Sequence, residues 1–124
     1  MTLPVSTRVV VVPTAATVAE ALETMHRERI RHLPVVHGTD CVGLVVQGDL
    51  VGVLGADRHV ALRTVAGFVH AVVPRVAPSD PPARVARAIL DGGLEAALVV
   101  ERGRLVGIVT GTDALRALVA GDAS

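Results

Sequence analysis

The chain of 124 residues contains no lysine, tryptophan or tyrosine, and Phe68 is its only aromatic residue. Because 51% of the residues are apolar, the core must be built from the aliphatic side chains of Val, Leu, Ile and Ala. The absence of lysine excludes a phosphate loop, which needs a Gly-Lys-Ser/Thr sequence. Cys41 is the only cysteine, which excludes an internal disulfide and any CxxC motif.

The chain also lacks a net charge and a long apolar run. The 12 basic residues, all arginine, balance 12 acidic residues, so the overall charge favours neither nucleic acid nor a membrane surface. No apolar run reaches the roughly 18 residues that a membrane-spanning helix requires. The N-terminus also lacks the basic region and apolar run of a signal peptide. By elimination, we expect a cytoplasmic protein with no nucleic-acid or membrane partner.

No constellation of residues typical of catalysis or metal binding is evident. His26, His32, His37 and Cys41 lie close in sequence, but their spacing fits no zinc motif. We therefore expect surface histidines, a cysteine within a strand, no metal site and no required cofactor. No Ser/His/Asp arrangement stands out either, so we expect that the protein is not an enzyme.

The sequence is instead duplicated with a register of 64 residues. Residues 35–54 and 99–118 align without a gap and are identical at seven of twenty positions. Such self-similarity predicts two similar units. The identical pairs are Val35 and Val99, Val36 and Val100, Val42 and Val106, Gly43 and Gly107, Val45 and Val109, Asp49 and Asp113, and Leu54 and Leu118.

Each copy is predicted to contain a strand, a helix, two strands and a second helix. In the first copy, Thr17 and Glu20 have the spacing of a capping box at the start of the first helix. Apolar residues follow it at helical spacing. They are Val18, Ala21, Leu22 and Met25, and the other expected elements are strands over 9–12, 33–36 and 41–46 and a helix over 49–54.

In the second copy, Asp80 is the expected N-cap of a helix with prolines in its first turn, and Gly92-Gly93 ends that helix. The near-continuous apolar strands are typical of an α/β fold with covered sheets. The expected strands are 72–76, 98–100 and 105–109, the last helix is 112–120, and the expected domains are 5–56 and 65–120 with a linker over 57–64.

The two tails Gly-Leu-Val-Val-Gln-Gly-Asp-Leu (43–50) and Gly-Ile-Val-Thr-Gly-Thr-Asp-Ala-Leu (107–115) resemble those of a CBS domain pair. So do Leu-Pro-Val-Val (33–36) and Leu-Val-Val (98–100), and the resemblance covers roughly residues 5–119. It implies two tandem β-α-β-β-α repeats packed with pseudo-twofold symmetry and often assembled into a homodimer. Many such modules bind AMP, ADP, ATP or S-adenosylmethionine between the repeats. We expect a stand-alone regulatory module that signals to an unknown partner protein.

The resemblance also implies the residues of the ligand site. The Ser/Thr-x-Ser/Thr-Asp tail of one repeat faces the first strand of the other repeat and the turn before its second strand. The tail carboxylate and hydroxyls suit ribose and phosphate, while the facing turn offers an apolar side chain and cationic groups. In this chain the tail is Thr110, Thr112 and Asp113, the facing turn is Ile30, Arg31 and His32, and Val5 and Val10 complete the adenine side.

The mirror site is expected to be weaker. Asp49 is retained, but Val46 and Gly48 replace the two threonines, and Glu95 stands in the facing turn. Its carboxylate disfavours phosphate by like-charge repulsion.

A simpler interpretation remains open for both parts of the stronger site. Thr110 and Asp113 also have the spacing of a capping box. Arg31 and His32 follow a helix, where basic residues offset the helix dipole without any ligand. The alternative function is then a ligand-free dimerisation or adaptor domain.

Overall fold

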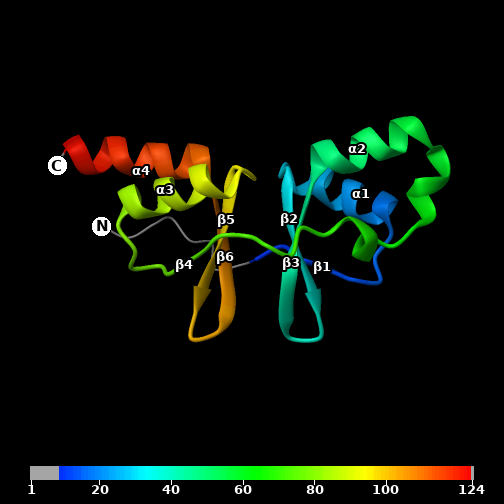
Figure 1. Ribbon diagram of the computed structural model, residues 1–124, viewed down its shortest axis with the longest axis horizontal. Helices are drawn as coiled ribbons and strands as arrows, with labels where there is room; N and C mark the ends of the chain where they lie inside the picture. Colours follow the sequence, from blue (N-terminus) through cyan, green and yellow to red (C-terminus); the bar gives the residue numbers. More distant parts are fainter. Residues whose placement is uncertain (1–8, 124) are drawn as a thin grey trace. The chain divides into compact units, whose positions relative to one another are not determined.

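The computed structural model describes residues 9–123, with the side chains of residues 9–121. The chain divides into an N-terminal unit, residues 10–72, and a C-terminal unit, which contains residues 73–123 and also Val9. Over the described residues the structure has four α-helices and two three-stranded sheets (Figure 1). Each unit has the order strand, helix, strand, strand, helix, which confirms the predicted α/β class and repeat plan.

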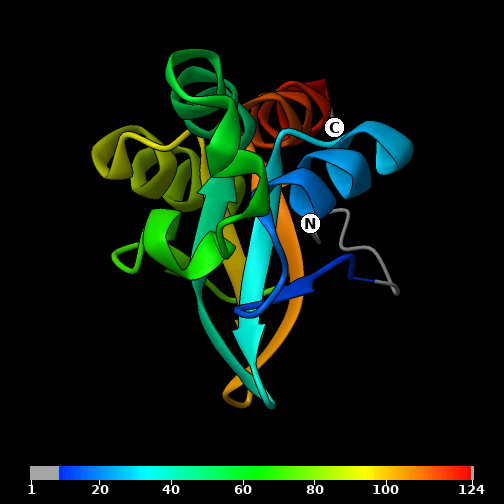
Figure 2. The ribbon, with the colours of Figure 1, turned by 90° about the vertical axis from the view of Figure 1, so that its right-hand side faces the viewer.

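In the N-terminal unit, the central strand β2 runs parallel to β1 and antiparallel to β3. The β2–β3 hairpin extends away from the two helices, as both views show (Figures 1 and 2). The elements are β1 (Val12–Pro13), α1 (Val18–Glu28), β2 (His32–His37), β3 (Asp40–Val46) and α2 (Gln47–Ala56), followed by the 3-10 helices η1 (Arg58–Leu62) and η2 (Val65–Phe68).

The C-terminal unit repeats this topology down to its register. Val12 pairs with Val35, and Val76 pairs with Val99 at the same offset. A bulge interrupts β2 at 35/36 and β5 at 99/100, so the duplication extends to an irregularity in the ladder. The elements are β4 (Arg75–Val76), α3 (Pro82–Gly92), β5 (Ala96–Glu101), β6 (Arg104–Thr110) and α4 (Gly111–Ala123).

Helix α1 forms as its sequence predicts. The Thr17 hydroxyl accepts a hydrogen bond from the Glu20 amide at 3.1 Å, and Glu20 Oε1 accepts one from the Thr17 amide at 3.3 Å. This is a complete capping box, so two amides at the helix start are satisfied by side chains. Val18, Ala21 and Met25 are fully buried on the inner face, and Leu22 is partly buried beside them.

Two predictions about strand length were wrong. The first strand spans Val12–Pro13 rather than 9–12, and its counterpart spans Arg75–Val76 rather than 72–76. Only two residues of each segment pair with the central strand, and a β-branched run without a partner forms no ladder. Pro13 is compatible with β1 because this is an edge strand.

The predicted N-cap of the third helix was also wrong. Asp80 does not cap α3, because its Oδ2 accepts a hydrogen bond from the Ala77 amide at 2.8 Å and closes the preceding turn. The N-cap is Pro81, and Pro82 is the first helical residue. The predicted end of the helix is confirmed, since Gly93 adopts a left-handed conformation with φ of 74°.

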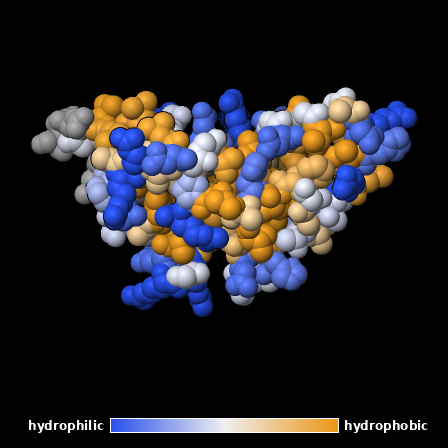
Figure 3. All heavy atoms as spheres, in the orientation of Figure 1, coloured by the Kyte–Doolittle hydropathy of each residue, from blue (hydrophilic) through white to orange (hydrophobic). Residues whose placement is uncertain are grey.

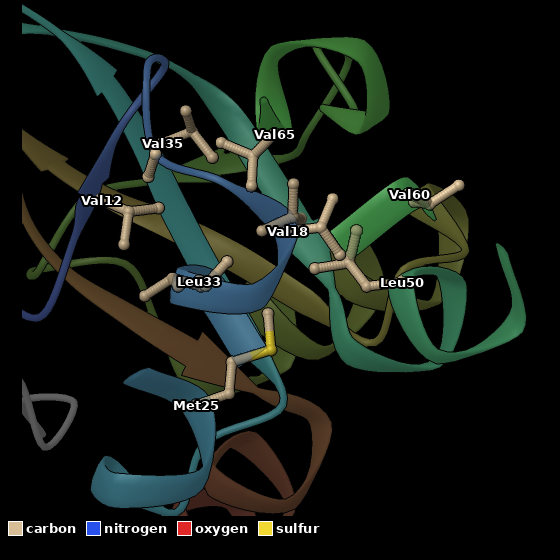
Figure 4. Close-up of a cluster of buried hydrophobic side chains, with 11 residues drawn as sticks. Val12, Val18, Met25, Leu33, Val35, Leu50, Val60 and Val65 are labelled. Atoms are coloured by element: carbon tan, nitrogen blue, oxygen red, sulfur yellow. The ribbon is translucent and has the colours of Figure 1, made fainter. Parts of the chain in front are cut away.

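Both cores are aliphatic, as composition predicts. In the N-terminal unit the strands, both helices and η1 contribute to one cluster (Figure 4). Its labelled members are Val12, Val18, Met25, Leu33, Val35, Leu50, Val60 and Val65. Because Val60 is 6% exposed, the segment predicted as a linker packs on this unit.

Residues 65–72 belong to the second copy by sequence but pack on the sheet of the first. His70 pairs with Leu44 of β3 through two backbone hydrogen bonds of 2.8 and 3.1 Å. The approach is close because Gly43 lies beneath this segment, where a Cβ atom would lie 2.1 Å from the His70 carbonyl oxygen. This packing carries a second-copy residue to the tail of the first copy.

Candidate functional site

The tail of the C-terminal unit lies where strand β6 passes into helix α4. Thr110 is the last residue of β6, and Asp113 lies in the first turn of α4. Asp113 Oδ2 accepts hydrogen bonds from the amide and the hydroxyl of Thr110, both at 3.0 Å. The Thr110 hydroxyl accepts one from the Asp113 amide at 3.3 Å. These bonds form the reciprocal cap that the simpler interpretation of this motif predicts.

The capped carboxylate retains one unused oxygen. Both bonds from Thr110 end on Oδ2, and Oδ1 of Asp113 accepts no hydrogen bond from a described residue. Asp113 is partly buried and Thr112 beside it is exposed. The tail therefore offers an oriented carboxylate oxygen and a hydroxyl next to the amides of a helix start, which suit hydroxyl and anionic groups of a ligand.

Each unit also brings its own turn against its own tail. The Gln47 amide donates to the Arg31 carbonyl at 2.8 Å, and the Gly111 amide donates to the Glu95 carbonyl at 3.0 Å. These bonds are equivalent in the 64-residue register. Glu95 is exposed and adopts a left-handed φ of 59°.

The turn of the N-terminal unit contains the predicted apolar and cationic residues. Ile30 packs partly buried against the core, and its amide donates to the Met25 carbonyl at 2.9 Å. Arg31 is exposed and forms no ion pair with another described side chain. His32 is the first residue of β2 and is partly buried. The turn thus presents a cationic side chain beside the start of α2.

Asp49 has a different partner from its counterpart Asp113. No side chain caps α2, whose N-cap is Val46. Instead, Asp49 Oδ2 contacts Nε2 of His70 at 2.5 Å, with side chains 52% and 38% exposed. His70 was not predicted as a site residue. The signal was the 64-residue register. It places His70 next to Val69, the counterpart of Val5, which the resemblance assigned to the adenine side of the stronger site.

The structure describes one of the two valines that were predicted for the adenine side. Val10 is partly buried and packs against the N-terminal core, whereas Val5 lies outside the described residues. The structure therefore brings together Thr110, Thr112 and Asp113 in one unit, and Ile30, Arg31, His32 and Asp49 in the other. Joint binding of one ligand by both sets stays a prediction.

The described residues contain no group of three or more His, Cys, Asp or Glu side chains that could hold a metal ion. Cys41 forms no disulfide, is partly buried, and donates from its sulfur to the Gly43 carbonyl at 3.5 Å. No helix in the described part of the chain is long and apolar enough to cross a membrane.

Comparison with solved structures shows the fold. A CBS-domain containing protein from Agrobacterium tumefaciens matches with a TM-score of 0.83 and 23% identity over 91% of each chain. The CBS domain pair of protein MJ0100, in complex with 5′-methylthioadenosine and S-adenosyl-L-methionine, matches with a TM-score of 0.80 and 23% identity over 92% of this chain and 94% of that one. CBSX2 in complex with AMP matches with a TM-score of 0.79 and 23% identity over 97% of this chain and 94% of that one.

Comparison with curated proteins finds no matching relative. The family model of the CBS domain, in contrast, matches twice, over residues 3–56 and 65–120. These two ranges include both tails and both turns described above. The chain therefore belongs to the CBS domain family and carries the domain as a tandem pair.

Proposed function

We propose that this CBS pair is a non-catalytic regulatory module that binds an adenosine nucleotide and signals its presence to a partner protein. The observation that carries the proposal is the tail at Thr110–Asp113, where the capped carboxylate of Asp113 has one oxygen that accepts no bond from a described residue, beside the exposed side chain of Thr112. Solved pairs of the same fold are complexes with AMP, with S-adenosyl-L-methionine and with ATP. The partner and the cytoplasmic location stay predictions.

In this proposal each group of the site has a chemical role. Asp113 accepts hydrogen bonds from ribose hydroxyls, because an ionised carboxylate only accepts. Thr112 donates to phosphate, while Thr110 uses its single hydroxyl hydrogen to hold the Asp113 carboxylate in place. Arg31 and His32 supply positive charge for the phosphate. The apolar contacts for adenine come from Ile30, Val5 and Val10.

The second cleft, with Asp49 and Glu95, is proposed to bind more weakly. It lacks both threonines, and Glu95 brings a negative charge toward a negative ligand. Repulsion between like charges at a partly exposed site costs on the order of 1 kcal/mol. A charged nucleotide therefore prefers the first cleft.

We also propose that the chain forms a homodimer through its exposed apolar helix faces. Leu115 and Val119 are one helical turn apart on α4 and are 60% and 62% exposed, and Val51 on α2 is 54% exposed. Figure 3 shows apolar atoms at the surface over α3 and α4. Closed twofold pairing buries such surface on both copies.

One observation favours the alternative of a ligand-free dimerisation or adaptor domain. The complete capping box at Thr110 and Asp113 explains both residues without a ligand. The two functions differ in what calorimetry measures with AMP, ADP, ATP, S-adenosylmethionine and NAD. The regulatory module binds at least one of them, and Asp113→Ala abolishes the binding while Asp49→Ala changes it little. An absence of binding by all five would leave the adaptor as the better account.

A further inference from the structure

A histidine of the second copy lies directly on the tail of the first. Nε2 of His70 is 2.5 Å from Oδ2 of Asp49. We propose that His70 closes the ribose position at Asp49 and thereby limits the chain to one bound nucleoside. This inference rests on the proposed function, because it assigns to Asp49 the same ribose contact as to Asp113.

The main chain of His70 is fixed against strand β3. Its amide donates to the Leu44 carbonyl at 2.8 Å, and its carbonyl accepts from the Leu44 amide at 3.1 Å. Gly43 has no side chain that would separate the two segments. The imidazole therefore extends from an anchored backbone to the first turn of α2, where Asp49 lies.

The two tail carboxylates have hydrogen-bond partners in different parts of the chain. The partner of Asp113 is Thr110, three residues away at the start of the same helix. The partner of Asp49 is 21 residues away in sequence, on the segment that precedes β4, the first strand of the second repeat. A ligand that lies between the tail and this segment needs the space that the imidazole crosses. Ribose hydroxyls would have to displace the imidazole and break a hydrogen bond to a carboxylate. Because this pair is about half exposed, we expect a loss of affinity of up to about tenfold.

The sequence register supports the same asymmetry. His70 corresponds to Ser6, and the flanking residues Val69 and Val5 are identical. A serine side chain is too short to replace an imidazole that spans from one segment to another. At this position the second copy therefore has a long side chain, His70, which contacts the Asp49 tail. The first copy has the short side chain of serine.

The test measures binding stoichiometry by calorimetry with adenosine, whose lack of charge removes any repulsion by Glu95. His70→Ser should raise the stoichiometry from one to two per chain, and His70→Ser with Asp49→Ala should return it to one. His59→Ser is the matched control, because His59 contacts Asp57 at 3.1 Å in an exposed pair elsewhere. It should leave one site.

The substitution at His70 leaves both backbone bonds to Leu44 in place, and circular dichroism checks the fold. The inference is overturned if wild type already binds two nucleosides, or if His70→Ser keeps one site with unchanged affinity. If no variant binds adenosine or AMP, the proposed function itself fails, which is a distinguishable result.

Discussion

Substitution of Asp113 by alanine should lower the thermal stability of the protein and should also abolish its stabilisation by AMP. Loss of a helix cap alone would cause only the first effect. The variant removes the two bonds that Oδ2 accepts from Thr110 and a negative charge at the start of α4. Because the site is partly buried, the lost bonds and the lost dipole interaction together cost about 1.5 kcal/mol of unfolding free energy. For a domain of this size, that lowers Tm by about 5 °C.

The second quantity is the stabilisation by ligand. AMP at 100 times its Kd stabilises the folded protein by about 2.7 kcal/mol. This should raise the Tm of the wild type by roughly 10 °C and should leave that of Asp113→Ala unchanged. The assay is thermal unfolding followed by circular dichroism, with and without AMP.

Glu20→Ala is the matched control, because Glu20 has the same place in the capping box of α1. Its Oε1 accepts from the Thr17 amide at 3.3 Å and from the Thr17 hydroxyl at 3.0 Å. This variant should lose a similar stability, about 1 kcal/mol, and keep the full AMP shift. If Asp113→Ala also keeps the full shift, Asp113 acts only as a helix cap and the reasoning for the site is refuted.

Three further predictions concern charge, assembly and packing. Arg31→Ala should weaken AMP about ten- to a hundredfold and leave adenosine unchanged, measured by calorimetry; equal losses would contradict a phosphate contact. Leu115→Glu places a charge on the exposed apolar face of α4 and should convert the dimer to a monomer in sedimentation at micromolar concentration, whereas a monomeric wild type would exclude the dimer. Gly43→Ala should cost about 3 kcal/mol of unfolding free energy in urea, because its Cβ would lie 2.1 Å from the His70 carbonyl oxygen. Gly52→Ala, with no atom within 4 Å of its Cβ, is the control and should shift stability by no more than about 1 kcal/mol.

Much of the fold was predictable because its signals are local. The capping box at Thr17 and Glu20, the helical spacing that buries Val18 and Met25, and the left-handed end at Gly93 each depend on residues within one or two turns. The repeat then carried these predictions from one copy to the other. The Thr110–Asp113 contact is equally local, and the sequence therefore indicated both its capping and its ligand-binding interpretation.

The sequence by itself thus determined the class of the fold, the order of its elements, the aliphatic cores and the position of both tails. Tertiary structure alone decided that β1 and β4 contain two residues each, because strand length depends on the partner strand. It also decided that residues 65–72 pack on the sheet of the first copy and that His70 reaches Asp49. That contact joins residues far apart in sequence, and no local pattern specifies it. It depends on a close backbone approach over Gly43, which exists only once the chain has folded.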